Sequence, residues 1–197
     1  MSDTRVKILR ESLALFNRLG VDKVSTNHIA KSLEMSPGNF YYHFANKEEI
    51  IRELFDQMTK KIDALWAFEV PAPPKPFFQA SMQVFWEFRF FHREMYALRR
   101  NDRVLSKRWH AHLDRSLITL KNILESWSER KIIREATSEA PSKLNDTNDL
   151  CSLIIITAGA YLQFYESTER RASSRTIDQG VNALMKVLQP YLLPSSK

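Results

Sequence analysis

The stretch at residues 35–50, MSPGNFYYHFANKEEI, constrains the fold more than the segments around it. Ser36 followed by Pro37 is typical of a helix start, because the amide hydrogen that proline lacks would be unpaired there anyway. Asn46 and Glu49 have the spacing of a capping box, which predicts the start of another helix. The helix between them has about seven residues, too few to be stable alone. We therefore expect a short helix that is held in place by its neighbours.

The short helix carries five consecutive ring side chains, at 40–44, that cannot all face the protein interior. Phe40 and Phe44 are four residues apart and share one helical face, so we expect both to be buried. Tyr41, Tyr42 and His43 must then point in other directions. Rings on a short helix are more often core than contact residues, but this arrangement favours an exposed aromatic surface.

The rest of the chain predicts an all-α fold. Only four of the 197 residues are glycine, and alternating apolar and polar runs are rare, which favours helices over strands. Apolar residues recur at helical spacing throughout. We expect about nine helices, at approximately 3–19, 26–33, 37–44, 47–68, 77–91, 94–99, 102–130, 148–168 and 174–191.

Two domains are predicted. Residues 1–46 would form a three-helix N-terminal domain, and residues 47–197 a larger helical domain. The helix at 47–68 would link them. The segment VPAPPKP at 70–76 has four of the eight prolines, so we interpret it as a stiff linker.

The N-terminal pattern favours DNA binding. Two short helices joined by a turn at 34–36 form a helix-turn-helix, whose second helix can enter the major groove. Tyrosine hydroxyls can donate to phosphate oxygens, and asparagine can bind adenine or a phosphate. His43, Lys47 and the N-terminus of the following helix supply further donors and positive charge.

Residues 4–50 resemble the DNA-binding domain of the tetracycline-repressor (TetR) family of transcriptional regulators. The matching pieces are ILRESLALF (8–16), Gly20 and STNHIAKSLEMSPGNFYYHFANKEEI (25–50). The resemblance implies a dimer with two-fold symmetry that binds a palindromic operator on double-stranded DNA. It also implies a repressor that is released from the operator by a small-molecule effector. In this family pattern residues 47–197 would be the effector-binding and dimerisation domain.

The resemblance also implies roles for individual residues. Those at positions that contact phosphates are Thr26, Tyr41, His43 and Lys47. Those at positions near base edges are Asn27, Pro37, Gly38, Asn39 and Tyr42. Two of these depart from the family pattern, since Gly38 has no side chain and Asn27 stands where longer basic residues are often found. We therefore expect base recognition to use few contacts together with DNA shape.

The segment at 77–91, FFQASMQVFWEFRFF, has seven aromatic residues in fifteen. A helix that is apolar on nearly all sides is buried on several of them. Lining of an effector pocket and plain core packing both remain open. The candidate residues for binding an apolar or amphipathic effector are Met82, Phe85, Trp86, Arg89, Trp109 and Phe164.

The positive charge is concentrated in the middle of the chain. Residues 89–134 have 12 Lys or Arg and 5 Asp or Glu, a net charge of +7, whereas residues 1–60 have 9 and 8. Three interpretations of the basic segment remain open: a solvated helix face, recognition of an anionic effector such as a fatty acid or acyl-thioester, and help in binding DNA phosphates.

Residues 150–165 form an uncharged run of 16 residues, shorter than the ~20 that a membrane helix needs. Ala158, Gly159 and Ala160 at its middle permit close helix approach. We expect a homodimer through the helices at about 148–168 and 174–191 and no membrane contact, although an intrachain core is the alternative.

Several functional classes find no support in the sequence. The pair His110 and His112 points in two directions on a helix, and no nearby acid or cysteine supports a metal site. We find no glycine-rich phosphate loop, nucleophile elbow or metal-ligand cluster, so we expect no cofactor and no enzyme. The start of the chain shows no apolar signal segment and Cys151 is the single cysteine, which favours the cytoplasm. The alternatives are an activator or effector-independent regulator and, more remotely, a helical enzyme.

Overall fold

The computed structural model describes residues 3–67, 71–134, 147–167 and 174–194. These residues form nine α-helices and no strand, which confirms the all-α prediction and the expected number of helices. The helices are α1 (Asp3–Leu19), α2 (Thr26–Ser32), α3 (Pro37–His43), α4 (Lys47–Trp66), α5 (Pro74–Glu87), α6 (Arg89–Asn101), α7 (Arg103–Glu129), α8 (Thr147–Ser167) and α9 (Ser174–Leu188), followed by a 3-10 turn at Gln189–Tyr191.

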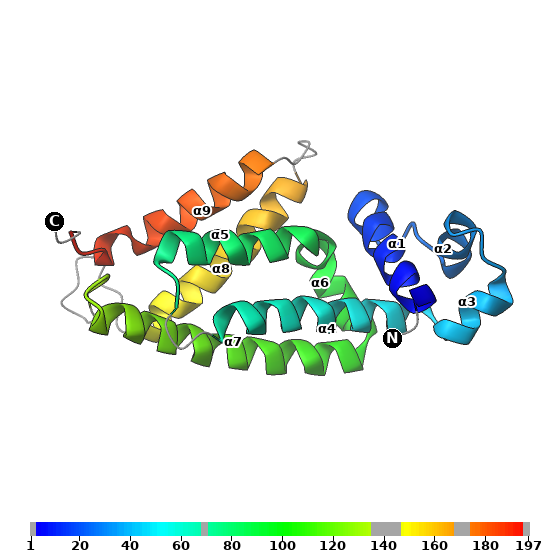
Figure 1. Ribbon diagram of the computed structural model, residues 1–197, viewed down its shortest axis with the longest axis horizontal. Coiled ribbons are helices and arrows are strands. Elements are labelled where there is room, and N and C mark those ends of the chain that lie inside the picture. The colour runs from blue at the N-terminus through cyan, green and yellow to red at the C-terminus, as the bar shows by residue number, and fades with distance from the viewer. Residues whose placement is uncertain (1–2, 68–70, 135–146, 168–173, 195–197) are drawn as a thin grey trace.

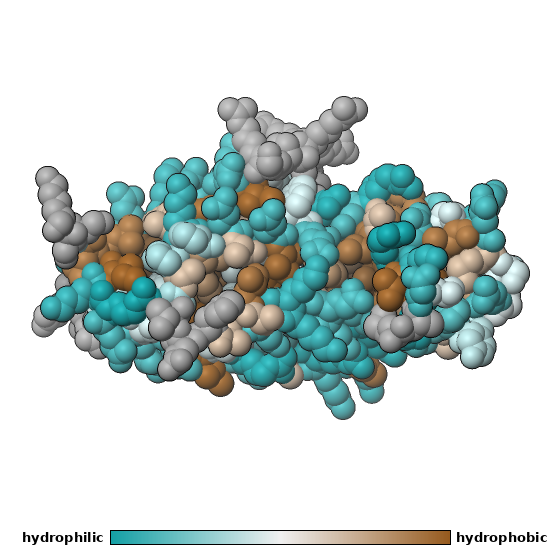
Figure 2. All heavy atoms as spheres, in the orientation of Figure 1, coloured by the Kyte–Doolittle hydropathy of each residue, from teal (hydrophilic) through white to brown (hydrophobic). Residues whose placement is uncertain are grey.

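Helices α1 to α3 lie at one end of an elongated molecule, and α8 and α9 lie toward the other (Figure 1). Helices α4 and α7 run side by side along its length, and α5 contacts both α4 and α9. Hydrophilic residues cover most of the face in Figure 2, with hydrophobic residues visible between them. The short helices thus occupy an exposed end, away from the bulk of the larger helical body.

The helix starts follow the predicted capping pattern. Ser25, Ser36 and Asn46 cap α2, α3 and α4, and each side chain accepts a hydrogen bond from the amide three residues later, at 3.1, 3.3 and 2.9 Å. Glu49 reaches back as expected, but its carboxylate accepts from the amide of Ala45 at 2.9 Å, one residue before the cap. These bonds pair amides that the first turn of a helix leaves unsatisfied.

The aromatic segment is divided differently from the prediction. We expected helices at 77–91 and 94–99, but α5 ends at Glu87 and a longer α6 begins at Arg89. α5 also begins at Pro74, inside the predicted linker, and residues 68–70 of that linker lie outside the described residues. Phe88, Phe90 and Phe91 are all buried. One continuous helix would place Phe88 and Phe91 on one face and point Phe90 away from it, so the break allows all three rings to share one core.

A side chain from α1 satisfies the backbone on both sides of this break. The Asn17 amide donates to the carbonyl of Glu87 at 2.8 Å, and its oxygen accepts from the amide of Phe90 at 3.1 Å. A helix end that is buried without partners is costly, and here the partners come from the N-terminal helices. The junction of α5 and α6 is therefore fixed to α1.

Two charged residues of α6 complete the attachment of α1. Arg93 donates to the carbonyl of Phe16 at 2.8 Å, in the last turn of α1. Gly20 then takes the left-handed conformation that ends the helix, with φ of 87°. Glu94 accepts from the next amide, that of Val21, at 2.9 Å.

The buried residues form two hydrophobic cores. The first joins α1 to α3 with the first half of α4, α6 and the start of α7, and includes Ile8, Phe40 and Phe55. The second joins α5 with the second half of α7, α8 and α9, and includes Trp127 and Leu188. The first core thus extends across the predicted domain boundary after residue 46, which stays a prediction.

Asp102 connects α4 to the start of α7. Its carboxylate caps α7 by accepting from the amides of Val104 and Leu105 at 2.9 and 3.1 Å, and it accepts from Arg52 of α4 at 2.6 Å. Burial alone would raise the pKa of the Asp102 carboxyl, but the Arg52 guanidinium and the two amides outweigh burial and lower that pKa. The charged form is therefore the stabilising one.

We predict that Asp102→Asn lowers the free energy of unfolding by about 1–3 kcal/mol at neutral pH, because asparagine can still cap the helix but loses the charged bond to Arg52. The pKa of Asp102 is lower in the folded than in the unfolded protein. The charged carboxylate therefore contributes its full stabilisation of the folded protein at pH values above its pKa in the unfolded chain, about 4. This contribution is lost as the pH falls through the pKa of the folded protein. Urea unfolding of both proteins at pH 7 and at about pH 2 measures this.

The matched control is Asp56→Asn, because Asp56 pairs with Arg108 at the same 2.6 Å but both side chains are 41% exposed. An exposed pair contributes at most about 1 kcal/mol. Two results would contradict the stabilising role of the Asp102 carboxylate. One is an equal loss of unfolding free energy in both variants, and the other is a loss in Asp102→Asn that is as large at about pH 2 as at pH 7.

Candidate DNA-binding surface and ligand cavity

The short helix α3 has the orientation that its sequence predicts. Phe40 and Phe44 are buried, at 1% and 0% exposure, within the first core. Tyr41 is 49% exposed and Tyr42 is 84% exposed. Two phenylalanines thus fix the roll of α3 and leave the tyrosines at the surface.

The other residues predicted to lie near base edges are also at the surface. Asn27 on α2 is exposed, as are Pro37, Gly38 and Asn39 in the first turn of α3. A Cβ at Gly38 would meet no atom within 4 Å, so this turn leaves open space in front of the helix. His43 is partly buried in the last turn of α3.

Three of the predicted phosphate contacts also hold the helix-turn-helix together. The hydroxyl of Tyr41 lies 3.0 Å from that of Thr26, which connects α3 to α2. The ammonium of Lys47 donates to the carbonyls of Val21 and Val24 at 2.8 and 3.1 Å. Lys47 therefore supports the loop before α2, and two of its three donors are already used.

Arg5, which the sequence analysis missed, links three of the N-terminal helices. Its guanidinium donates to Glu49 at 3.0 Å and to Glu53 at 3.0 Å, both on α4, and to the carbonyl of His43 at the end of α3. It also lies 3.9 Å from the centre of the Phe44 ring. The hydrogen bond to Glu53 is the main reason that the pKa of Arg5 is raised.

A sequence signal for Arg5 did exist. Arg5 precedes Ile8 and Leu9 by three and four residues, so it continues the apolar stripe of α1. A cation in line with a buried stripe needs partners. The sequence did not show that they come from α3 and α4.

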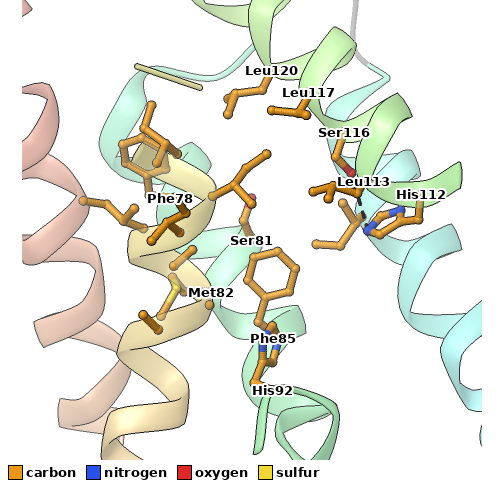
Figure 3. A pocket seen from close by; sticks show the side chains of 18 of the residues that line it. Phe78, Ser81, Met82, Phe85, His92, His112, Leu113, Ser116, Leu117 and Leu120 are labelled. Atoms are coloured by element: carbon orange, nitrogen blue, oxygen red, sulfur yellow. Dashed lines mark hydrogen bonds between the residues drawn. The ribbon is translucent and has the colours of Figure 1, made fainter. Parts of the chain in front are cut away.

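A cavity of about 510 Å³ lies within the larger helical body. Its wall comes from α4 to α9, and Figure 3 shows Ser81 and Phe85 of α5 facing the same space as Leu113 and Ser116 of α7. The wall is mostly apolar and aromatic, with Trp66, Phe77 and Phe78 among its members. It includes no charged side chain from the part of the chain that the structure describes.

Three of the six predicted effector residues line this cavity. They are Met82, Phe85 and Trp109. Trp86, Arg89 and Phe164 do not line it. The Arg89 guanidinium lies over the Trp86 ring, 4.8 Å from its centre, and donates to the Trp86 carbonyl at 3.3 Å. Phe164 is 63% exposed on α8.

Two histidines in the wall were not predicted as effector contacts. The His92 ring of α6 makes an edge-to-face contact with the ring of Phe85, with ring centres 5.1 Å apart. His112 of α7 lies with its Nε2 3.5 Å from the hydroxyl of Ser116. The sequence analysis considered His112 only as a metal ligand with His110.

Both histidines are held in the neutral form. Burial lowers the pKa of His92 to about 4. Burial also lowers the pKa of His112, against a smaller opposing effect of Asp63. His92 Nε2 and His112 Nδ1 are buried and have no hydrogen-bond partner among the described residues.

The basic segment at 89–134 is used mainly at the protein surface and at helix junctions. Arg93 binds α1, Arg108 pairs with Asp56 and Arg99 lies 5.6 Å from the centre of the Trp109 ring. Arg100 and Arg103 are exposed. These contacts favour a solvated and structural role for the segment.

The described residues have neither a cluster of metal-ligating side chains nor a membrane-spanning helix. They contain no group of three or more His, Cys, Asp or Glu side chains that could hold a metal ion. None of their helices is long and apolar enough to cross a membrane.

Two family models match the chain. The model for bacterial regulatory proteins of the tetR family matches residues 8–54, which include α2, α3 and most of α1. The TetR model, described as bacterial transcriptional repressor, matches residues 72–197, more than half of the chain. The protein belongs to the TetR family. The matched N-terminal range contains the exposed tyrosines, and the matched C-terminal range contains most of the cavity wall.

Solved and curated members of the family are similar to this TetR-family chain to different extents. A TetR-family transcriptional regulator from Marinobacter aquaeolei VT8 has a TM-score of 0.85 and 28% identity, over 98% of this chain and 93% of that one. TcmR from Streptomyces glaucescens is 40% identical over 47 residues, and the negative regulator IcaR from Staphylococcus epidermidis is 38% identical over 47 residues. Each match covers 24% of this chain and only 21% and 25% of those relatives.

We predict that Arg5→Gln lowers the free energy of unfolding by about 1–3 kcal/mol, because it leaves Glu53 and the end of α3 without their partner. Chemical unfolding followed by circular dichroism measures the change. Arg10→Gln is the matched control, since Arg10 is exposed on the same helix. We expect the control to change stability by less than about 0.5 kcal/mol. Equal effects of the two substitutions would show that the Arg5 contacts are not stabilising.

Proposed function

We propose that this protein is a DNA-binding transcriptional regulator that acts as a dimeric repressor and is released from its operator by a small apolar molecule. The main support is the orientation of α3, with two phenylalanines buried and the adjacent tyrosines exposed. Membership of the TetR family supports the same function. Such a regulator acts where the chromosome is, in the bacterial cytoplasm.

In the proposed complex α3 enters the major groove of the operator. Tyr42 and Asn39 would lie near base edges, and Tyr41 and Thr26 would bind phosphates. Lys47 would act mainly by positioning α2, since its ammonium already binds two carbonyls. The net charge of residues 1–60 is close to zero, so individual hydrogen-bond donors would contribute more to DNA affinity than net charge.

The proposed dimer forms through α8 and α9. Leu153, Ile156 and Phe164 are 38%, 63% and 63% exposed on α8, and Ala160 between them is exposed too. Spacings of three and four residues place these side chains on one helical face. An apolar stripe on an exposed helix supports contact with a second copy of the chain, which would set α3 of each copy about 34–36 Å apart on DNA.

Ligand response would pass through α4 and α6, since both contribute to the cavity and both contact the N-terminal helices. Met58 and Ile62 of α4 line the cavity, and the same helix binds Arg5 near its start. His92 of α6 lines the cavity, and the adjacent Arg93 binds α1. A ligand shifts the equilibrium only as far as it prefers one arrangement of these helices.

Selection of genomic DNA fragments by the purified protein, at a stated salt concentration, tests the proposal. We expect a palindromic site whose affinity falls when an effector is added. A protein indifferent to duplex DNA at low salt would overturn the proposal. Operator binding that no ligand changes would favour an effector-independent regulator, and increased transcription from the site would favour an activator.

We predict different effects of two adjacent substitutions on operator binding. Tyr41→Ala should weaken binding to all sequences, because it removes a phosphate contact and the bond to Thr26. Tyr42→Ala should cost about 1–3 kcal/mol for the best site and less for others, because a base contact is lost. Titration of labelled operator and of sequence variants measures both effects.

Both tyrosines are exposed, so we expect the two variants to remain folded by circular dichroism. Uniform weakening by Tyr42→Ala would contradict its placement at base edges. Unfolding of either variant would show that the ring has a structural role.

We predict that Ile156→Arg converts the dimer to a monomer, because it places a charge in the apolar stripe of α8. Ile118→Arg on α7 is the matched control, since Ile118 has the same 63% exposure. Analytical ultracentrifugation should give a monomer for the first variant and a dimer for the second. A dimer in both would place the subunit contact elsewhere.

A further inference from the structure

The polar groups of the cavity differ in how far they are already used. The hydroxyl of Ser81 already accepts from the indole of Trp66 at 3.0 Å and donates to the carbonyl of Phe77 at 2.9 Å, so its single donor is used. His92 Nε2 and His112 Nδ1 are buried without partners among the described residues. Among the buried polar side-chain atoms of the described wall, these two imidazole nitrogens are therefore the ones with unused hydrogen-bonding capacity.

Three charged residues near the cavity, Arg89, Arg115 and Asp63, are directed away from it. Arg89 lies on Trp86 outside the wall. Arg115 and Asp63 are 56% and 50% exposed and lie 3.9 Å apart, so both face solvent. No charged group of the described wall could thus neutralise a buried carboxylate or ammonium.

We infer that the cavity selects an uncharged, mostly apolar molecule with one hydrogen-bonding group, such as a hydroxyl or carbonyl, that binds His92 or the pair of His112 and Ser116. The inference rests on the proposed function in assigning the cavity to the effector. The volume of about 510 Å³ lies within the range of about 300–1,000 Å³ typical of small-molecule sites.

The preference for an uncharged ligand follows from two different free-energy costs, that of burying an unpaired polar atom and that of burying an unpaired charge. A buried imidazole nitrogen without a partner costs free energy, which a ligand hydroxyl or carbonyl recovers on binding. A buried ion without a counter-ion costs far more than one hydrogen bond returns. A carboxylate would need an imidazolium as its partner, and burial lowers the pKa of both histidines and opposes that form.

Calorimetric titration with head-group series on two skeletons tests the charge selection. The probes are decanol, decanoate and decylammonium, and the corresponding methanol, carboxylate and methylammonium derivatives of naphthalene, all at neutral pH. We expect the better alcohol to bind at least about tenfold more tightly than either ion on the same skeleton. Equal or tighter binding of the carboxylates, or no binding of either alcohol, would overturn the inference.

Titrations in two buffers of different ionisation enthalpy show whether binding takes up a proton. We expect no proton uptake with the alcohols. Proton uptake on binding of a carboxylate with comparable affinity would overturn the inference, because a histidine would then carry charge in the complex.

Substitution of each histidine tests the hydrogen bond. His92→Leu or His112→Leu should reduce the affinity for naphthalenemethanol by about three- to tenfold and leave that for naphthalene unchanged. Leu113→Ala is the control in the same wall, and should reduce both affinities alike. Removal of an unpaired buried nitrogen is not expected to unfold the protein, and whichever variant remains folded supplies the test. An unchanged affinity for the alcohol in both variants would overturn the role of the imidazoles.

Operator binding, measured separately with and without the alcohols, distinguishes failure of this inference from failure of the proposed function. Tight alcohol binding with unchanged operator affinity would support the ligand class and count against the effector role. Operator release by the charged probes alone would support the regulator and overturn the ligand class.

Discussion

The attachment of α1 to the break between α5 and α6 is the contact on which the arrangement of the molecule depends. Phe90 can share one core with Phe88 and Phe91 because the helix is interrupted between α5 and α6. The interruption exposes backbone groups that Asn17 satisfies from the N-terminal helices. Arg93 and Glu94 of α6 in turn pair with backbone groups at the end of α1, so the helix-turn-helix is attached to the body that contains the cavity.

This dependence explains which parts of the fold the sequence could predict. Ser36, Pro37 and Asn46 act locally, so the starts of α3 and α4 were correct. The predicted end of the helix at 77–91 was wrong. Helical periodicity describes a single helix, and it cannot show that the side-chain amide of Asn17 pairs with the backbone at a break in that helix. Tertiary contacts therefore set the boundary between α5 and α6, which falls inside the predicted helix at 77–91.

The two candidate sites could be predicted from the sequence to different degrees, for the same reason. On α3, burial of two phenylalanines determines by geometry which neighbours are exposed, so residue spacing was sufficient. In the cavity, core and wall residues share the same composition, and Phe78 and Phe85 were indistinguishable from buried packing by sequence alone. His92 and Arg5 were missed because the meaning of a single polar residue in an apolar stripe depends on partners from other helices.

The excess positive charge illustrates how composition can mislead about function. The net charge is +6, yet the excess lies in residues 89–134 rather than in the helix-turn-helix. In the structure Arg93 binds carbonyls of α1 and Arg108 pairs with α4, so these cations hold helices together. The cavity wall contains none of them. Since charge on a buried wall would need a partner in every state of the protein, an uncharged wall lets the cavity stay empty or filled at little electrostatic cost.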